Sequence, residues 1–507
     1  MAAGYHPQVL VRSRKRLLIG LALALLGVLP FLGKPVHVDD ANFLVLAEGA
    51  AVDLWRPHAL EINWQGQTER AFDVLSNPPG IGWWLAPVHD APTPLQHLWM
   101  LPWLALALFG AHRLGKAFLG DGPAGVLLLG TAPVVALAGQ ALTPDLPLYA
   151  CTLAGVGGFL TSRRYAWAFA LLAGCAALFR YSGVCLVPLL VLAGWQRGRA
   201  LPALLSALPV GLLALHDLHA YGQVHLLAMT GFQSVSNTQV DVFRKGVAAL
   251  AMLGGVGLLP VLSVRDRGWM GLLAGAALGF VAAHYSQQSG LGMSLTVLFT
   301  AAGGAAFAQL RWRTPEDRVL LAWTLGGLFF LLSLRFAASR YWLPFLAGPV
   351  LAAARRSLDD RWLAGAVAVN LLVGLGVSVD DYRFAKAHEL AAQLVGPGPG
   401  SFAGHWGWQH HLEEAGWTPL EDDGAPLSPH AVALAPWPQQ PGEGHCLRLV
   451  EEYTLPDTWP GPRVHTAEGF ANLHAFVISG EPPVETYSPW SFSSEPYEIV
   501  QLYEACP

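Results

Sequence analysis

Two adjacent carboxylates, Asp39 and Asp40, are the residues of this 507-residue chain best suited to chemistry. They follow the first strongly apolar run, residues 17–33, which is long enough to cross a bilayer at about 1.5 Å per residue. Neighbouring acids at a membrane surface are unusual unless they handle a proton, a cation or a hydroxyl group. The simpler alternative is that they cap a helix beginning near Asp40.

Two Pro-containing motifs lie at the starts of later apolar segments. Asn77 precedes Pro78 and Pro79, and this sequence either begins a helix or positions an amide for a substrate. Asp145 follows Thr143-Pro144 between two apolar runs, with no long loop to explain a carboxylate there. Thr143 could cap the next helix, or Asp145 could support the acidic pair.

A late motif supplies a cation. Arg340 and Tyr341 stand at the end of an apolar run, three residues before Pro344. An arginine in this position usually extends its side chain to lipid phosphates, and the functional alternative is a bidentate grip on one particular phosphate. Lys34 and Arg70, which lie between the first two apolar runs, are further candidates to bind a phosphate.

Composition indicates the element type that positions these motifs. Hydrophobic residues make up 53% of the chain and charged residues 13%, compared with about 25% charged in soluble proteins. We therefore expect an all-α polytopic membrane bundle of about thirteen transmembrane helices. The predicted spans are residues 17–33, 95–111, 123–140, 145–161, 166–179, 182–195, 201–217, 247–263, 269–284, 291–309, 319–335, 342–354 and 362–378.

Basic residues predict the orientation of the bundle in the membrane. A cluster from Arg12 to Arg16 precedes the first run, and every second loop after it is basic, as the positive-inside rule requires. The N-terminus is therefore expected in the cytoplasm, and all the motifs above on the outer side. Lys34-Pro35-Val36 offers no small-x-small cleavage site, so the first run is interpreted as an uncleaved helix of a multi-pass protein of the bacterial inner membrane.

Charge also divides the chain into two expected domains. The membrane module spans residues 1–378, and its first outer loop, residues 34–94, is apolar enough for short interfacial helices carrying Trp83 and Trp84. From Asp380 onward, eighteen acidic residues face four basic ones. No apolar run there could span a membrane, so residues 379–507 are expected to form a small extracytoplasmic α+β domain.

The five cysteines fall into two groups. Cys151, Cys175 and Cys185 lie in apolar runs and are expected to pack as small hydrophobic residues. Cys446 and Cys506 lie in the tail, where an extracytoplasmic location would allow a disulfide between them.

The four motifs, in this order and all on the outer side, resemble those of the GT-C glycosyltransferases. The resemblance is to the branch of protein O-mannosyltransferases and the lipid A aminoarabinose transferase, and it covers about residues 17–355. Asp39-Asp40 matches the acidic pair after the first helix, and Asn77-Pro78-Pro79 matches a motif where His is common in place of Asn. Asp145 matches the acid after the third span. Arg340-Tyr341-x-x-Pro344 matches the late Arg-Tyr motif.

The resemblance implies a membrane glycosyltransferase that moves a sugar, with inversion, from a polyprenyl phosphate to an unidentified glycan, lipid or protein acceptor. Asp39 and Asp40 would be catalytic, and Asn77, Asp145, Arg340 and Tyr341 would bind substrate. We expect no nucleic-acid partner and no tail metal site at His405, His410 and His411. A divalent cation at the acidic pair is neither required nor excluded by the sequence.

Two other classes of function remain open from the sequence. A transporter or flippase of a lipid-linked substrate would use Asp39, Asp145 and Arg340 as coupling charges, although such charges usually lie near the bilayer midplane. A non-catalytic assembly protein would use its acidic tail to recruit a partner.

Overall fold

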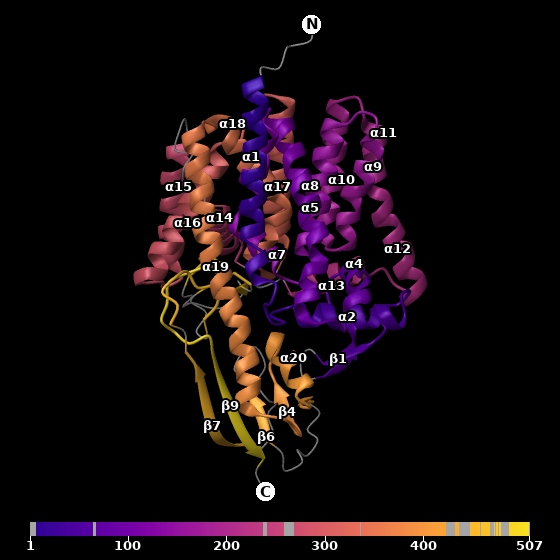
Figure 1. Ribbon diagram of the computed structural model, residues 1–507, viewed down its shortest axis with the longest axis vertical. Coiled ribbons are helices and arrows are strands. Elements are labelled where there is room, and N and C mark those ends of the chain that lie inside the picture. Colours follow the sequence, from indigo (N-terminus) through magenta and orange to yellow (C-terminus); the bar gives the residue numbers. More distant parts are fainter. Residues whose placement is uncertain are drawn as a thin grey trace.

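The computed structural model describes most of the chain. The described residues are 7–63, 67–236, 241–257, 268–334, 336–421, 431–434, 447–456, 458–466, 471, 473–474, 476–477 and 486–505. Within them, a helical bundle forms one half of the molecule and a β-containing tail forms the other (Figure 1).

The bundle consists of helices that follow one another along the chain. They are α1 (Pro7–Leu26), α5 (Thr93–Leu119), α6 (Gly122–Gly130), α7 (Pro133–Gly139), α8 (Asp145–Thr161), α9 (Ala166–Gly174), α10 (Leu186–Gln196), α11 (Ala200–Leu204), α12 (Leu208–Tyr221), α13 (His225–Ser236), α14 (Val242–Gly257), α15 (Gly268–Tyr285), α16 (Gly290–Ala308), α17 (Pro315–Ser333), α18 (Ala347–Ser357) and α19 (Asp360–Val395). The short 3₁₀ helices η1 (Leu29–Phe31), η3 (Cys175–Leu178), η4 (Tyr181–Cys185), η5 (Leu205–Ala207) and η7 (Ser339–Phe345) extend or interrupt them.

Small residues let these helices approach one another closely, as in other membrane bundles. A Cβ at Gly110 of α5 would lie 2.2 Å from the backbone nitrogen of Ala154 in α8. A Cβ at Gly254 of α14 would lie 2.0 Å from the carbonyl oxygen of Phe299 in α16. The bundle is therefore held by backbone-close contacts that larger side chains would separate.

Each expected span overlaps one of these helices or a broken pair of them. Four helical stretches in the described part of the chain are individually long and apolar enough to cross a membrane: residues 200–221, 268–285, 290–308 and 360–395. The pair α6 and α7, bent by 73°, makes a fifth if it is one span. The chain is thus a helical protein with several membrane-spanning candidates, and thirteen spans remains a prediction.

The loop between α1 and α5 contains the short elements expected of it. They are α2 (Asp40–Val52), the antiparallel strands β1 (Glu61–Asn63) and β2 (Thr68–Arg70), α3 (Ala71–Val74), α4 (Gly80–Leu85) and η2 (Ala86–Val88). Figure 1 shows α2 lying across the end of the bundle that faces the tail.

The tail is built on a five-stranded sheet in the order β5-β4-β6-β9-β7. Its elements are β4 (Gly400–Ala403), α20 (Trp406–Glu414), β5 (Thr418–Pro419), β6 (Ala431–Leu434), β7 (Leu447–Leu455) and β9 (Glu498–Ala505). β4 pairs in parallel with β5 and β6, whereas β9 pairs antiparallel with β6 and β7. Cys446 and Cys506, and hence their expected disulfide, lie outside the described residues.

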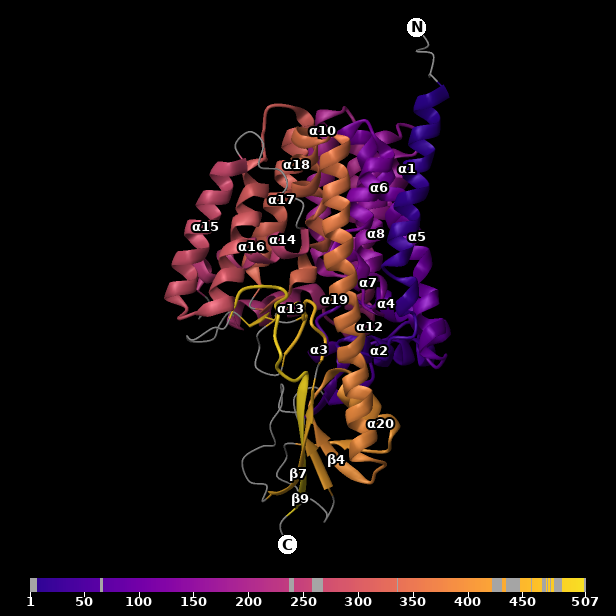
Figure 2. The same cartoon turned by 60° about the vertical axis from the view of Figure 1, so that its left-hand side comes forward.

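The tail is firmly attached to the bundle. α19 continues without a break from the bundle to the sheet (Figure 2), so the expected boundary after residue 378 falls inside one helix. In the tail, β8 (Phe476–Val477) pairs with β3 (Phe336–Ala337), which directly precedes the Arg340 segment. Trp490 also donates its indole N–H to the carbonyl of Gly255 in α14, 3.0 Å away.

Candidate active site

Asp39 and Arg340 form an ion pair between the start of α2 and η7, 301 residues apart in sequence. Asp39 is the N-cap residue of α2, but its side chain accepts no capping hydrogen bond. Arg340 is mostly buried, with 12% of its side chain exposed, so it does not extend freely into lipid. The capping and lipid-contact alternatives therefore do not describe these two side chains.

Asp145 connects a second guanidinium to this pair. One of its carboxylate oxygens lies 3.8 Å from Nε of Arg340, and the other lies 2.8 Å from Nε of Arg180. Thr143 donates its hydroxyl to Asp145 at 3.1 Å, so it orients the carboxylate and does not cap α8, whose N-cap is Pro144. Asp145 is buried and holds both arginines beside Asp39.

Tyr341 lies close to both cations. The guanidinium carbon of Arg180 is 5.0 Å from the centre of the Tyr341 ring, and that of Arg340 is 5.9 Å from it. Arg180 stands between η3 and η4, where the backbone is extended. In the sequence, Arg180 is an isolated arginine between two apolar segments, and none of the four motifs includes it.

Asp40 points in a different direction from Asp39. Its side chain is buried, and one of its oxygens accepts the backbone N–H of Leu142 at 2.8 Å, which fixes the turn before Asp145. The other oxygen has no hydrogen-bond partner among the described residues. Asp40 is thus placed to position the site, whereas Asp39 is the more exposed acid of the pair.

The two acids differ in their electrostatics. Burial alone would raise the pKa of Asp39, but the charge and hydrogen bond of Arg340 outweigh it and hold this pKa below its ordinary value. Burial raises the pKa of Asp40 to about 7, although Lys34 and the Leu142 N–H oppose the shift. Asp39 is therefore an anion near neutral pH, while Asp40 changes charge there.

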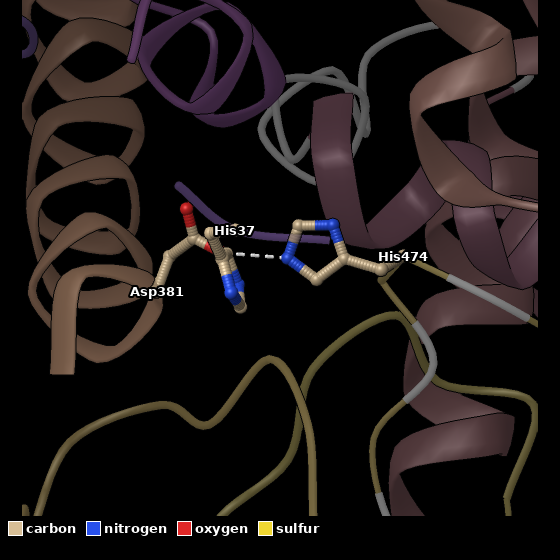
Figure 3. A group of neighbouring side chains, drawn as sticks. All are labelled: His37, Asp381 and His474. Atoms are coloured by element: carbon tan, nitrogen blue, oxygen red, sulfur yellow. Dashed lines mark hydrogen bonds and ion pairs between the residues drawn. The ribbon is translucent and has the colours of Figure 1, made fainter. Parts of the chain in front are cut away.

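Lys34 contacts the tail-proximal part of α19. Its ammonium lies 2.8 Å from one oxygen of Asp381, and both side chains are buried. The other oxygen of Asp381 faces His37 at 3.3 Å and accepts a hydrogen bond from His474 at 2.6 Å (Figure 3). Burial lowers the pKa of His37 to about 3, so its ring is neutral. The sequence motifs singled out none of Asp381, His37 and His474.

The remaining expected substrate contacts lie elsewhere in the loop. The carbonyl oxygen of Asn77 lies 3.0 Å from Nε2 of His58, and no contact of its side chain with Asp39 or Arg340 is seen among the described residues. Arg70 is exposed and pairs with Asp73 at 2.8 Å, so its charge is balanced within the loop. The structure therefore gathers Asp39, Asp145, Arg340 and Tyr341, and not Asn77 or Arg70.

Gly80 nevertheless links the Asn77 motif to the site. A Cβ there would lie 2.3 Å from the carbonyl oxygen of Leu178, two residues before Arg180. The turn formed by Pro78 and Pro79 thus brings α4 against the segment that carries Arg180.

Two cavities are lined by residues of both α2 and α20 of the tail. The larger, about 830 Å³, is lined by residues including Glu48, Arg56 and Glu413. The smaller, about 390 Å³, is lined by residues including Asp90 and His410. The lining of neither includes Asp39 or Arg340, but both lie along the helix that Asp39 begins.

Comparison with known proteins gives a similarity in structure only. No family profile matches the chain, and no curated protein matches it significantly. The crystal structure of ArnT from Cupriavidus metallidurans bound to undecaprenyl phosphate is 15% identical, covers 83% of this chain and 92% of its own, and gives a TM-score of 0.41. The apo structure of the same protein is 13% identical, covers 85% of this chain and 94% of its own, and gives a TM-score of 0.40. Both similarities extend over most of this chain and most of ArnT.

Proposed function

We propose that the protein is an integral membrane glycosyltransferase that uses a polyprenyl-phosphate sugar as donor and an extracytoplasmic hydroxyl or amine as acceptor. The observation that carries this proposal is the arrangement of one accessible carboxylate, Asp39, beside two guanidiniums, Arg340 and Arg180, that share Asp145. A carboxylate can accept a proton, and a pair of guanidiniums can bind a phosphate.

The guanidinium pair suits a phosphate leaving group. Arginine presents a planar fork of N–H donors that matches phosphate oxygens, and Asp145 fixes both forks before the substrate arrives. Preorganised donors stabilise the charge that develops when the bond to the sugar breaks. The aromatic ring of Tyr341 attracts both cations and helps to hold them in place.

Asp39 is the proposed base. The acceptor oxygen or nitrogen attacks the anomeric carbon, the bond from this carbon to the phosphate oxygen breaks with its electron pair, and the acceptor proton moves to Asp39. Attack opposite the phosphate inverts the anomeric centre. A donor phosphate on Arg340 would loosen the ion pair to Asp39, and the loss of that pairing would raise the pKa of Asp39 toward a value suited to a base.

The environment of the site supports a lipid-linked donor. The site lies where an apolar bundle meets a polar tail, so a polyprenyl chain can remain among the helices while the phosphate and sugar reach the charged residues. Large exposed apolar side chains such as Leu212, Leu215 and Phe329 indicate that the outside of the bundle contacts lipid.

The experiment is a transfer assay with the purified full chain and a panel of polyprenyl-phosphate sugars, with release of polyprenyl phosphate as the readout. Asp39→Asn should lower kcat by at least about 10²-fold, since general-base help contributes about 10²- to 10⁴-fold. Asp73→Asn, which alters an exposed acid of the same loop, is the matched control and should retain activity.

Two results would contradict the proposal. One is an Asp39→Asn variant that keeps most of the wild-type activity while inserting normally in the membrane. The other is movement of a labelled lipid-linked sugar across a proteoliposome bilayer without release of lipid phosphate, which would favour a flippase.

A further inference from the structure

Three side chains from distant parts of the sequence meet beside the active site (Figure 3). His37 precedes α2, Asp381 lies in α19, and His474 belongs to the tail. One potential ligand atom from each lies within 4.8 Å of the other two. We propose that His37, Asp381 and His474 form a binding site for Zn²⁺ that ties the tail to the segment carrying Asp39.

The hydrogen-bonding pattern leaves imidazole nitrogens for this role. Nε2 of His37 is buried and has no hydrogen-bond partner among the described residues, although it lies 3.3 Å from Oδ1 of Asp381. Buried ring nitrogens are normally satisfied, so the unpartnered Nε2 of His37 is an exception, and a metal bound to Oδ1 of Asp381 would satisfy it. A metal bound by the Nε2 atoms would use both rings, since those atoms face the same oxygen of Asp381.

The distances are close to those of a zinc site. Ligand atoms about 2.0–2.1 Å from a tetrahedral zinc lie about 3.3 Å apart. Oδ1 of Asp381 is 3.3 Å from Nε2 of His37 and 2.6 Å from Nε2 of His474. Metal binding would therefore replace the His474–Asp381 hydrogen bond. It would move Nε2 of His474 and Oδ1 of Asp381 from 2.6 Å to about 3.3 Å apart.

The donor set selects the type of ion. Two imidazoles and one carboxylate, with a fourth position for water, are typical of Zn²⁺, whereas Mg²⁺ and Ca²⁺ prefer oxygen ligands. Lys34 occupies the other oxygen of Asp381 at 2.8 Å, so it orients this carboxylate but also opposes a cation through its charge. Asp40 interacts with the charge of the same Lys34 and offsets part of that repulsion.

The proposed metal site adjoins the two segments that carry Asp39 and Arg340. Leu473, the neighbour of His474, accepts the backbone N–H of Ser339 at 3.2 Å, and Ser339 precedes Arg340. His37 lies two residues before Asp39. A metal here would therefore fix both members of the Asp39–Arg340 pair through their backbones, and it would do so whether or not the protein transfers a sugar.

The test measures metal content and stability on the full chain, with the affinity tag removed. Purified wild-type protein should contain about one zinc per chain by mass spectrometry. It should lose this zinc to a chelator and regain both the metal and a higher melting temperature when ZnCl₂ is added. His474→Ala should weaken zinc binding by more than the roughly 10- to 100-fold typical of lost outer-shell contacts, and His474→Cys should restore it.

His410→Ala is the matched control. His410, His411 and Glu414 form another group with ligand spacing on α20, and their side chains are more exposed than His37 and Asp381. This variant should keep the zinc. Visible absorption of Co²⁺-loaded wild type provides a second readout that needs no variant to fold.

Three results would overturn the inference. They are a wild type that binds neither Zn²⁺ nor Co²⁺, a His474→Ala variant that keeps the metal, and loss of the metal in the His410 variant alone. In each case the three residues would be a cluster of polar side chains that binds no metal.

Discussion

At the residue scale, Arg180 reaches the site from a segment that the sequence motifs did not include. Its two contacts with Asp145, at 2.8 and 3.2 Å, hold the planar guanidinium in a fixed orientation. An isolated arginine in an apolar stretch gives no indication of its partner. Only the packing of the segment between η3 and η4 against α8 brings the two together.

Arg180→Lys tests whether this fork binds the donor. Lysine keeps the charge but loses the second N–H, so we expect the KM for the lipid donor to rise about tenfold or more, with a smaller change in kcat. Steady-state kinetics of polyprenyl-phosphate release measures KM and kcat separately. Arg164→Lys, at an exposed position beside Tyr165, is the control. An unchanged KM for the Arg180 variant would remove this residue from the proposed phosphate site.

Asp40 predicts a pH dependence of stability. Its pKa is raised from 3.8 to about 7 in the folded chain, so between these values the folded state holds a proton that the unfolded state has lost. Asp40 therefore adds to the free energy of unfolding at low pH, and this contribution is lost as the pH rises to about 7. Asp40→Asn mimics the protonated form, so its melting temperature relative to wild type should rise by a few degrees between pH 5 and 8.

Differential scanning fluorimetry across this pH range measures the effect. Asp53→Asn is a suitable control, because the carboxylate of Asp53 is bound to Arg56 and its pKa is lowered. A difference between Asp40→Asn and wild type that does not change with pH would show that Asp40 does not titrate near neutrality.

At the element scale, α4 has to approach the end of η3 for Arg180 to be in place. Gly80→Ala would push a methyl group against the Leu178 carbonyl, where a Cβ would lie 2.3 Å from oxygen. We expect a loss of about 1–3 kcal/mol in stability and a raised KM for the lipid donor. Thermal unfolding and donor kinetics on the same samples measure both effects.

Gly211→Ala is the control for this substitution. Position 211 lies in α12, and a methyl group added there would meet no neighbouring atom within 4 Å, so alanine should be neutral or slightly stabilising. If both alanine variants behave alike, the close contact of α4 with η3 does not matter for the site.

At the scale of the whole molecule, three arginines that the sequence assigned to the inner side form ion pairs at one end of the described bundle. Arg16 pairs with Asp121 and Asp360, Arg197 pairs with Glu316, and Arg356 pairs with Asp317. These contacts join the starts of α6, α17 and α19 at the end of the bundle away from the tail (Figures 1 and 2). Arg16, Arg197 and Arg356 thus lie at the same end of the bundle, and the membrane topology stays a prediction.

This arrangement predicts which end faces the cell exterior. In a background without native cysteines, Glu69→Cys in the first outer loop should react with a membrane-impermeant maleimide in whole cells. Arg163→Cys at the opposite end should react only after permeabilisation. Both positions are exposed, unlike Asp40, so a lack of labelling reports sidedness and not burial. The reverse pattern would leave the proposed site facing the cytoplasm.

The sequence by itself determined the helical character of the chain and the presence of basic residues in every second loop between apolar runs. Hydropathy, charge and β-branched runs are local properties, so they can be recognised without the fold. It also identified Asp39, Asp145, Arg340 and Tyr341, because each stands out as polar at the end of an apolar run.

Only the tertiary structure decided how these residues combine. Asp39 pairs with Arg340, Asp40 turns to the backbone of Leu142, and His474 reaches Asp381 from the tail. These partners are about 90 to 300 residues apart in sequence. Such contacts depend on which helices pack together and how closely small residues let them approach, and no local pattern in the chain encodes that choice.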